Sequence, residues 1–94
     1  AQERNEAPRL YRALCNIADQ LKSGGRDYAG LEGTARRELE SNGWRVDYVS
    51  VRDASTLLPP VGEVNQYVVL GAAWLGTTRL IDNIEVSIEP LGPV

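Results

Sequence analysis

The chain has 94 residues, an ordinary share of apolar and charged side chains and a formal net charge of −3, which fits a single small globular domain over residues 1–94. Its arginines are interleaved with acidic residues, so it lacks the excess positive charge expected of a protein that binds nucleic acid. No apolar stretch is long enough to cross a bilayer, which argues against a membrane protein.

The scarcity of histidine and cysteine excludes histidine-based catalysis and a zinc site of the usual kind. The sequence has no histidine and one cysteine, Cys15, so it has neither the commonest general base nor the ligands of a usual zinc site. It also has no methionine, and we therefore expect residue 1 to follow processing or to begin a fragment. The unpaired Cys15 and a polar start, AQERNEAPRL, favour a cytoplasmic location over secretion.

Two helices are predicted first. Proline at position 8 suits a first helical turn, and this helix is expected to end at Lys22–Gly25, where a basic residue precedes glycines. Asp27 is the expected N-cap of the second helix, which ends at Asn42–Gly43. Apolar residues recur at helical spacing in both segments: Leu10, Leu14, Ile17, Ala18 and Leu21 in the first, and Tyr28, Leu31, Ala35 and Leu39 in the second.

Beyond Gly43 the apolar period changes to two, which predicts strands. Around residues 44–51 the parity slips after Tyr48, which indicates a β-bulge or a half-buried strand. Residues 53–57 indicate a helical turn capped by Asp53, and residues 58–62 a loop.

The next strand, residues 67–74, is apolar at both parities and is expected at the centre of the sheet. We expect it to supply these residues to one core: Val68, Val69, Leu70, Ala72 and Trp74. A hairpin at residues 75–77 leads to a third strand reaching about Ile88, with one face formed by Leu80, Ile84, Val86 and Ile88, and residues 92–94 are expected to fray. The predicted fold class is α+β, in the order α-α-β-β-β, with both helices packed on a mainly antiparallel three-stranded sheet.

Motifs that resemble binding sites have simpler explanations. KSGGR at residues 22–26 lacks the full phosphate-loop spacing and fits a helix end. Gly30–Gly33 matches the bare GxxG of a KH loop, but Glu32 would repel phosphate. Cys15 has no histidine to activate it and is expected to be a boundary residue, while Arg36–Arg37 is balanced by neighbouring acids on a solvated helix face.

Three polar residues follow the hairpin: Arg79, Asp82 and Asn83. They either hydrogen-bond to their own backbone or face a surface that this chain does not supply. The backbone explanation is favoured for Asp82 and Asn83, because partly buried side chains of this kind usually bond to backbone groups.

The segments DYVSVRDASTL at residues 47–57 and AAWLGTTRLIDN at residues 72–83, after the helix LYRALCNIADQL, resemble the C-terminal domain of the pantothenate synthetase (pantoate–β-alanine ligase) family. The resemblance runs from about Pro8 to Ile88. It implies a parent enzyme that uses ATP and Mg²⁺ to join pantoate to β-alanine through a pantoyl adenylate. An N-terminal Rossmann-type domain would hold the substrates and form a homodimer, and the C-terminal domain would cover the site as a lid.

The resemblance also limits which residues can act. The family's histidine-containing nucleotide motif cannot lie in a chain without histidine, and Arg4–Asn5 lacks the two preceding serines of the phosphate-binding motif. No catalytic, cofactor-binding or metal residue is therefore assigned, and no ATP or Mg²⁺ is expected on this piece alone. Possible lid contacts are Arg79, Asp82 and Asn83. The alternatives are a free-standing KH-like module and a protein–protein adaptor.

Overall fold

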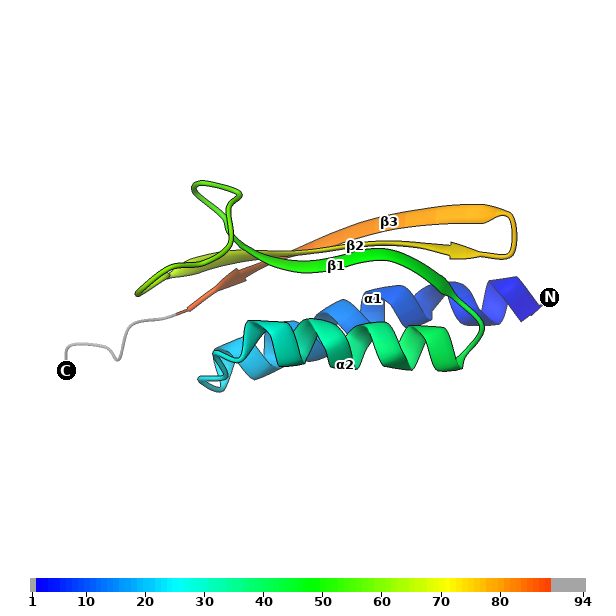
Figure 1. The fold of residues 1–94 in the computed structure, drawn as a ribbon, viewed down its shortest axis with the longest axis horizontal. Coiled ribbons are helices and arrows are strands. Elements are labelled where there is room, and N and C mark those ends of the chain that lie inside the picture. The colour runs from blue at the N-terminus through cyan, green and yellow to red at the C-terminus, as the bar shows by residue number, and fades with distance from the viewer. Residues whose placement is uncertain (1, 89–94) are drawn as a thin grey trace.

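The computed structural model describes residues 2–88, and of residues 2–5 the backbone only. The elements follow the predicted order (Figure 1): α1 (Gln2–Lys22), α2 (Tyr28–Ser41), β1 (Arg45–Asp53), β2 (Gln66–Leu75) and β3 (Thr78–Ser87). The sheet is antiparallel in the order β1-β2-β3, and both helices lie on one side of it (Figure 1). This confirms the predicted α+β class.

Helix α1 begins earlier than predicted, so the expectation that Pro8 lies in the first turn is wrong. Pro8 is inside a helix that starts at Gln2. The residues before Pro8 are mostly good helix formers, and side-chain contacts hold this end in place. Glu6 accepts hydrogen bonds from Arg9 Nε at 2.7 Å and from the indole Nε1 of Trp44 at 3.2 Å.

The predicted end of α1, the cap of α2 and its end are confirmed. Gly24 follows α1 at φ 99° and Gly43 follows α2 at φ 88°, a left-handed conformation that glycine adopts without strain. The carboxylate of Asp27 accepts from the backbone N–H of Gly30 at 3.1 Å. The GxxG sequence thus lies inside α2, and residues 22–25 are a helix end.

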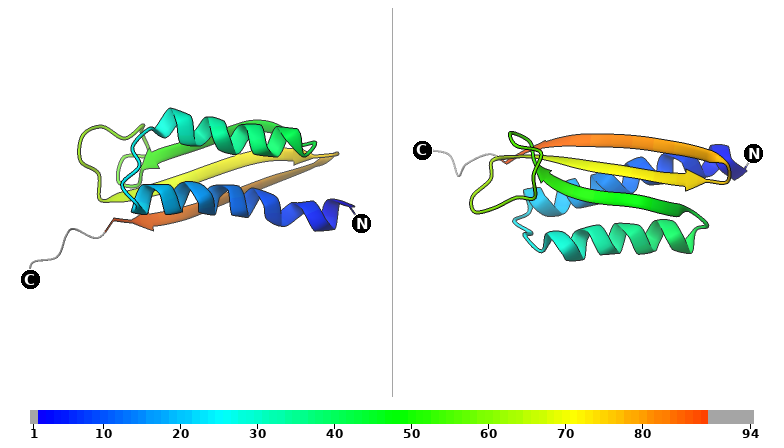
Figure 2. Two further views of the ribbon diagram at one scale, coloured as in Figure 1. Left: turned by 90° about the horizontal axis from the view of Figure 1, so that it is seen from below. Right: turned by 45° about the horizontal axis from the view of Figure 1, so that its top comes forward.

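The core lies between the helices and the sheet (Figure 2). Its residues come from all five elements and include Leu14, Leu21, Leu39, Val51, Val69 and Val86, which are almost fully buried. β1 does contain a bulge, but the register shift lies between Val46 and Tyr48, before the position after Tyr48 at which the parity was predicted to slip. Leu80 and Ile84 pack against this core beside the buried Val86, and so does Ile88 just past β3, as predicted. Residues 92–94 lie outside the described residues.

The expectation for β2 is partly wrong. Of its five apolar residues assigned to one core, only Val69 belongs to the cluster under the helices. Residues of one strand alternate between the two faces of a sheet, so Val68, Leu70, Ala72 and Trp74 lie on the opposite face. Leu70 and Trp74 are only half-buried there.

The turn after β1 is shorter than predicted. The predicted helical turn is present as a single turn over residues 54–56, closed by the hydrogen bond from the Leu57 N–H to the Asp53 carbonyl at 2.7 Å, and it does not continue into a helix. The carboxylate of Asp53 accepts from the backbone N–H and the hydroxyl of Ser55, at 2.9 and 2.7 Å. Asp53 therefore braces a tight turn at the end of β1.

Tyr67 gives the domain a predictable sensitivity to alkali. It is fully buried, and its hydroxyl lies 2.8 Å from the Tyr28 hydroxyl. Burial, and then this hydrogen bond, raise the pKa of Tyr67 to about 12, against about 10 in an unfolded chain. The raised pKa stabilises the fold fully below about pH 10, and that contribution is lost as the pH rises through about 12.

We expect the free energy of unfolding to fall more steeply between about pH 10 and 12 in the original chain than in Tyr67→Phe. Urea unfolding of both proteins at several pH values measures this difference. Parallel curves for the two proteins would show that Tyr67 ionises as freely in the fold as in the unfolded chain.

Candidate functional site

One face of the sheet is left uncovered by the helices, and we call it the open face (Figure 2). Its residues form four rows across β1, β2 and β3. The rows are Arg45–Trp74–Arg79, Tyr48–Ala72–Ile81, Ser50–Leu70–Asn83 and Arg52–Val68–Glu85. The two-residue strand period places these residues on one face within β2 and β3, and in β1 the bulge before Tyr48 brings Tyr48 to the same side as Arg45.

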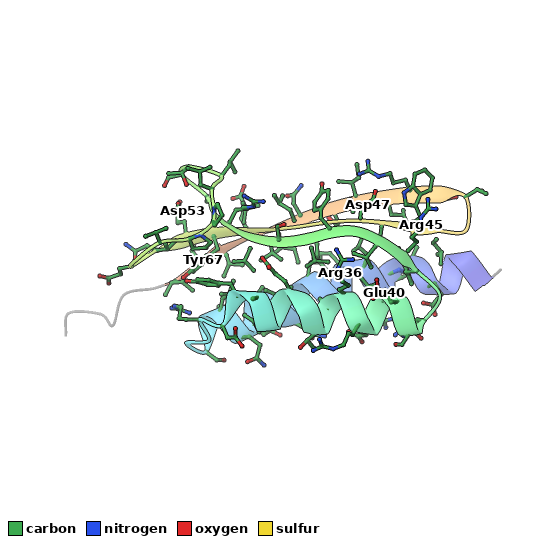
Figure 3. All side chains as sticks on the ribbon, viewed as in Figure 1. Arg36, Glu40, Arg45, Asp47, Asp53 and Tyr67 are labelled. Carbon is green, nitrogen blue, oxygen red and sulfur yellow. The ribbon has the colours of Figure 1, made fainter. Side chains whose placement is uncertain are left out.

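The row nearest the β2–β3 hairpin is charged and aromatic. The Arg45 guanidinium lies 5.1 Å from the centre of the Trp74 ring, within the range of a cation–π contact. Arg79, on β3, reaches across β2 to β1, where its Nε donates to Asp47 Oδ2 at 2.8 Å. This bond holds the pKa of the Asp47 carboxyl below its ordinary value. Arg45 and Asp47 both lie on the side of β1 away from the helices (Figure 3).

The middle of the open face is apolar. Tyr48 and Ile81 flank Ala72 and are 37% and 62% exposed, while Ala72 itself is fully buried. The loop between β1 and β2 rises on this side of the sheet (Figure 1). A hollow of about 480 Å³ lies between loop and sheet, lined by Tyr48, Ser50, Arg52, Leu57 and Leu70.

The loop carries three exposed apolar side chains, Leu57, Leu58 and Val61. Leu57 has φ 61°, a left-handed conformation that costs a leucine about 1–2 kcal/mol. Its N–H donates to the carbonyl of Asp53 at 2.7 Å, which holds the turn closed. The strained turn holds an apolar side chain in water, an arrangement that is unfavourable for the domain alone.

The three residues predicted as possible lid contacts do not form one cluster. Arg79 and Asn83 belong to the open face, whereas Asp82 has the opposite parity and lies on the helix side of β3. The Asp82 carboxylate accepts from the backbone N–H of Asn83 at 2.8 Å. The backbone role expected of Asp82 is therefore present, and contact with another domain stays a prediction for all three.

Both edges of the sheet are occupied by side chains. Glu32 accepts from the backbone N–H of Val51 at 2.7 Å, and Arg36 donates to the carbonyls of Val46 and Asp47 at 3.5 and 3.4 Å. Asp82 occupies an N–H of β3 in the same way. These contacts hinder pairing of another strand with the β1 edge, whereas on β3 a single N–H is occupied.

Neither metal binding nor membrane insertion has support among the described residues. Within residues 2–88, no three acidic or cysteine side chains are grouped to hold a metal ion. Cys15 is a half-buried free thiol. Neither helix in this part of the chain has the length and hydrophobicity needed to cross a bilayer. The surface that distinguishes the domain is therefore the open face, which is not evident from the sequence because β2 is apolar at both parities.

Comparisons with known proteins are consistent along the whole domain. A family model described as pantoate-beta-alanine ligase matches residues 1–85. The chain is similar to the pantothenate synthetase of Chromobacterium violaceum, with 60% identity over 87 residues that make up 92% of this chain and 31% of that protein. For the pantothenate synthetase of Laribacter hongkongensis the identity is 56% over 87 residues, with the same two shares.

A solved structure gives the same result. A crystal structure of pantothenate synthetase from Thermus thermophilus superposes with a TM-score of 0.79 at 32% identity, covering 93% of this chain and 32% of that one. The chain thus spans about a third of the length of the relatives it matches.

Proposed function

Because the chain belongs to the pantoate-beta-alanine ligase family, we propose that it is the C-terminal lid domain of a pantothenate synthetase. The parent enzyme joins pantoate to β-alanine at the expense of ATP, with Mg²⁺, through a pantoyl adenylate, and releases AMP and pyrophosphate. The observation that carries the proposal is the family match over residues 1–85. The inferred partner is the N-terminal domain of the same polypeptide.

The residues described do not fit ATP or Mg²⁺, so no chemical step is assigned to them. In the glycine turn after α1, the N–H groups of Gly24 and Gly25 donate to the carbonyls of Leu21 and Gln20, at 3.1 and 2.8 Å. They are not free to cradle a phosphate. On this proposal the nucleotide and the metal bind the N-terminal domain.

The role left to this chain is that of a cover. Closing a lid excludes water from the reacting groups and fixes their geometry, without requiring the lid to supply a reacting side chain. Arg79 and Asn83 lie on the open face and are the proposed contacts with the partner domain, while Asp82 braces the edge of β3.

We also propose, from the resemblance, that the parent is a homodimer through its N-terminal domain. A cytoplasmic location is proposed because the free Cys15 suits a reducing compartment.

The alternative of a KH-like module has little support. A KH loop needs its GxxG segment free to clamp a phosphate backbone. Here Gly30–Gly33 is helical, and Glu32 is bonded to β1. No observation favours a free-standing adaptor over a domain of a longer enzyme.

The proposal is tested on the complete polypeptide that contains this chain. Incubated with ATP, Mg²⁺, pantoate and β-alanine, it should form pantothenate and AMP in equal amounts. Each substrate is left out in turn as a control. Release of ADP in place of AMP, or no pantothenate at all, would contradict the proposed reaction.

A further inference from the structure

The open face differs from the solvated side of an ordinary antiparallel sheet. Such a face usually alternates with the buried one as polar against apolar. In β2, however, four of the five residues with open-face parity are apolar: Val68, Leu70, Ala72 and Trp74. The fifth, Gln66, is polar and begins the strand. A buried helix-side face and an apolar open face on the same strand mean that β2 is built to be covered on both sides.

The two outer strands add a polar border to this apolar strip. On β1 the border consists of Arg45, Ser50 and Arg52, and on β3 of Arg79, Asn83 and Glu85. An apolar centre within a polar rim is the usual anatomy of a protein–protein interface. Trp74 lies between Arg45 and Arg79, and tryptophan and arginine are among the residue types that contribute most to the binding energy of such interfaces.

The charge of this face also differs from that of the whole chain. Three arginines, Arg45, Arg52 and Arg79, stand against two carboxylates, Asp47 and Glu85, although the chain as a whole carries −3. A surface that complements the open face therefore presents apolar groups in its middle and negative charge opposite its rim.

We infer that the open face docks against the N-terminal domain of the parent polypeptide, with the helices α1 and α2 turned outward to solvent. This inference rests on the proposed function, since it takes that domain as the occupant. The relatives are about three times as long as the matched segment, so most of the parent chain lies outside the domain described here.

Three features of the domain favour this occupant over a second copy of the chain. On the β1 edge, Glu32 and Arg36 occupy backbone groups, which favours a face-to-face approach over strand pairing there. Two copies of the open face would also bring together rims that each carry one excess positive charge, which disfavours that contact. A covalently linked domain meets the face at high effective concentration, so even a modest area suffices.

Cysteine labelling in the complete polypeptide tests the inference. The background is Cys15→Ser, and the open-face variants are Ile81→Cys and Asn83→Cys, both at exposed positions. Thr34→Cys, at an exposed position on α2, is the matched control. A thiol reagent is applied with and without Mg²⁺, ATP and pantoate. The modified sites are read by peptide mass spectrometry, and each rate is divided by that of the same variant unfolded in urea.

We expect the two open-face cysteines to react at least about tenfold more slowly than Thr34→Cys in the native polypeptide, because docking removes them from solvent except during opening. Equal rates at all three positions under both conditions would overturn the docking, and so would protection confined to Thr34→Cys. Circular dichroism shows whether each variant is folded. If one of the two open-face variants fails to fold, the labelling rate of the other is compared with that of Thr34→Cys.

Pantothenate formation by the Cys15→Ser background, whose open face is unchanged, separates this inference from the proposed reaction. Pantothenate formation without protection of the open face overturns the docking and leaves the function in place. Protection without pantothenate formation supports the docking and overturns the function.

Discussion

Replacing Leu14 with alanine should lower the free energy of unfolding of the isolated chain by about 2–5 kcal/mol. Leu14 is fully buried on α1, facing β2. A Cβ atom built at Gly71 would lie 3.1 Å from Leu14 Cδ2 and 3.2 Å from Leu10 Cδ1, so helix and strand meet closely there. The strand is held by hydrogen bonds on both sides and cannot readily fill the cavity. Urea unfolding followed by circular dichroism measures the loss.

The control is Ile81→Ala on the open face, which we expect to change the free energy of unfolding by less than about 0.5 kcal/mol. Ile81 is 62% exposed in the isolated domain. Similar losses of unfolding free energy for Leu14→Ala and Ile81→Ala would mean that both faces of the sheet contribute equally to stability. That result would contradict a core located between the helices and the sheet.

The second large effect concerns nucleotide binding. We expect the isolated chain to bind Mg²⁺-ATP no more tightly than about 1 mM, equivalent to about −4 kcal/mol or weaker. Several of its arginines already contact carboxylates: Arg9 contacts Glu6 and Glu38, Arg36 contacts Glu40, and Arg79 contacts Asp47. A triphosphate would have to displace these partners at scattered surface positions, with no prepared site to repay the cost.

Isothermal titration calorimetry of the isolated chain, with the complete polypeptide as the positive control, measures this binding. The complete polypeptide should give a saturable curve and the isolated chain only heats of dilution. A micromolar, saturable isotherm from the isolated chain would place a nucleotide site within these residues.

The helices were predictable because their apolar residues repeat at helical spacing and their ends carry unambiguous signals, such as Asp27 and Gly43. The start of α1 could not be predicted, because Pro8 is compatible with the first turn of a helix as well as with a later position. Only the tertiary contacts of Glu6 with Arg9 and Trp44 show that the preceding turns are held in place.

The faces of the sheet could be predicted only in part. Residues 67–74 are apolar at both parities, so their pattern does not tell which side the helices cover. The bulge at Asp47 also shifts the parity of β1, and this brings Tyr48 onto the open face with Trp74. The strand period alone could have separated Asp82 from Arg79 and Asn83, because residues an odd number apart lie on opposite faces. What remained hidden was the apolar strip within its polar rim, since it depends on the pairing of three strands.

The measurement that tests the central claim most directly is turnover by the purified chain alone, assayed beside the complete polypeptide. The account predicts that the chain, given ATP, Mg²⁺, pantoate and β-alanine, forms no pantothenate, because a lid fixes geometry only when it closes on a domain that holds the substrates. Pantothenate formation by the isolated chain that persists through repeated purification, and that falls when the chain is unfolded, would contradict it.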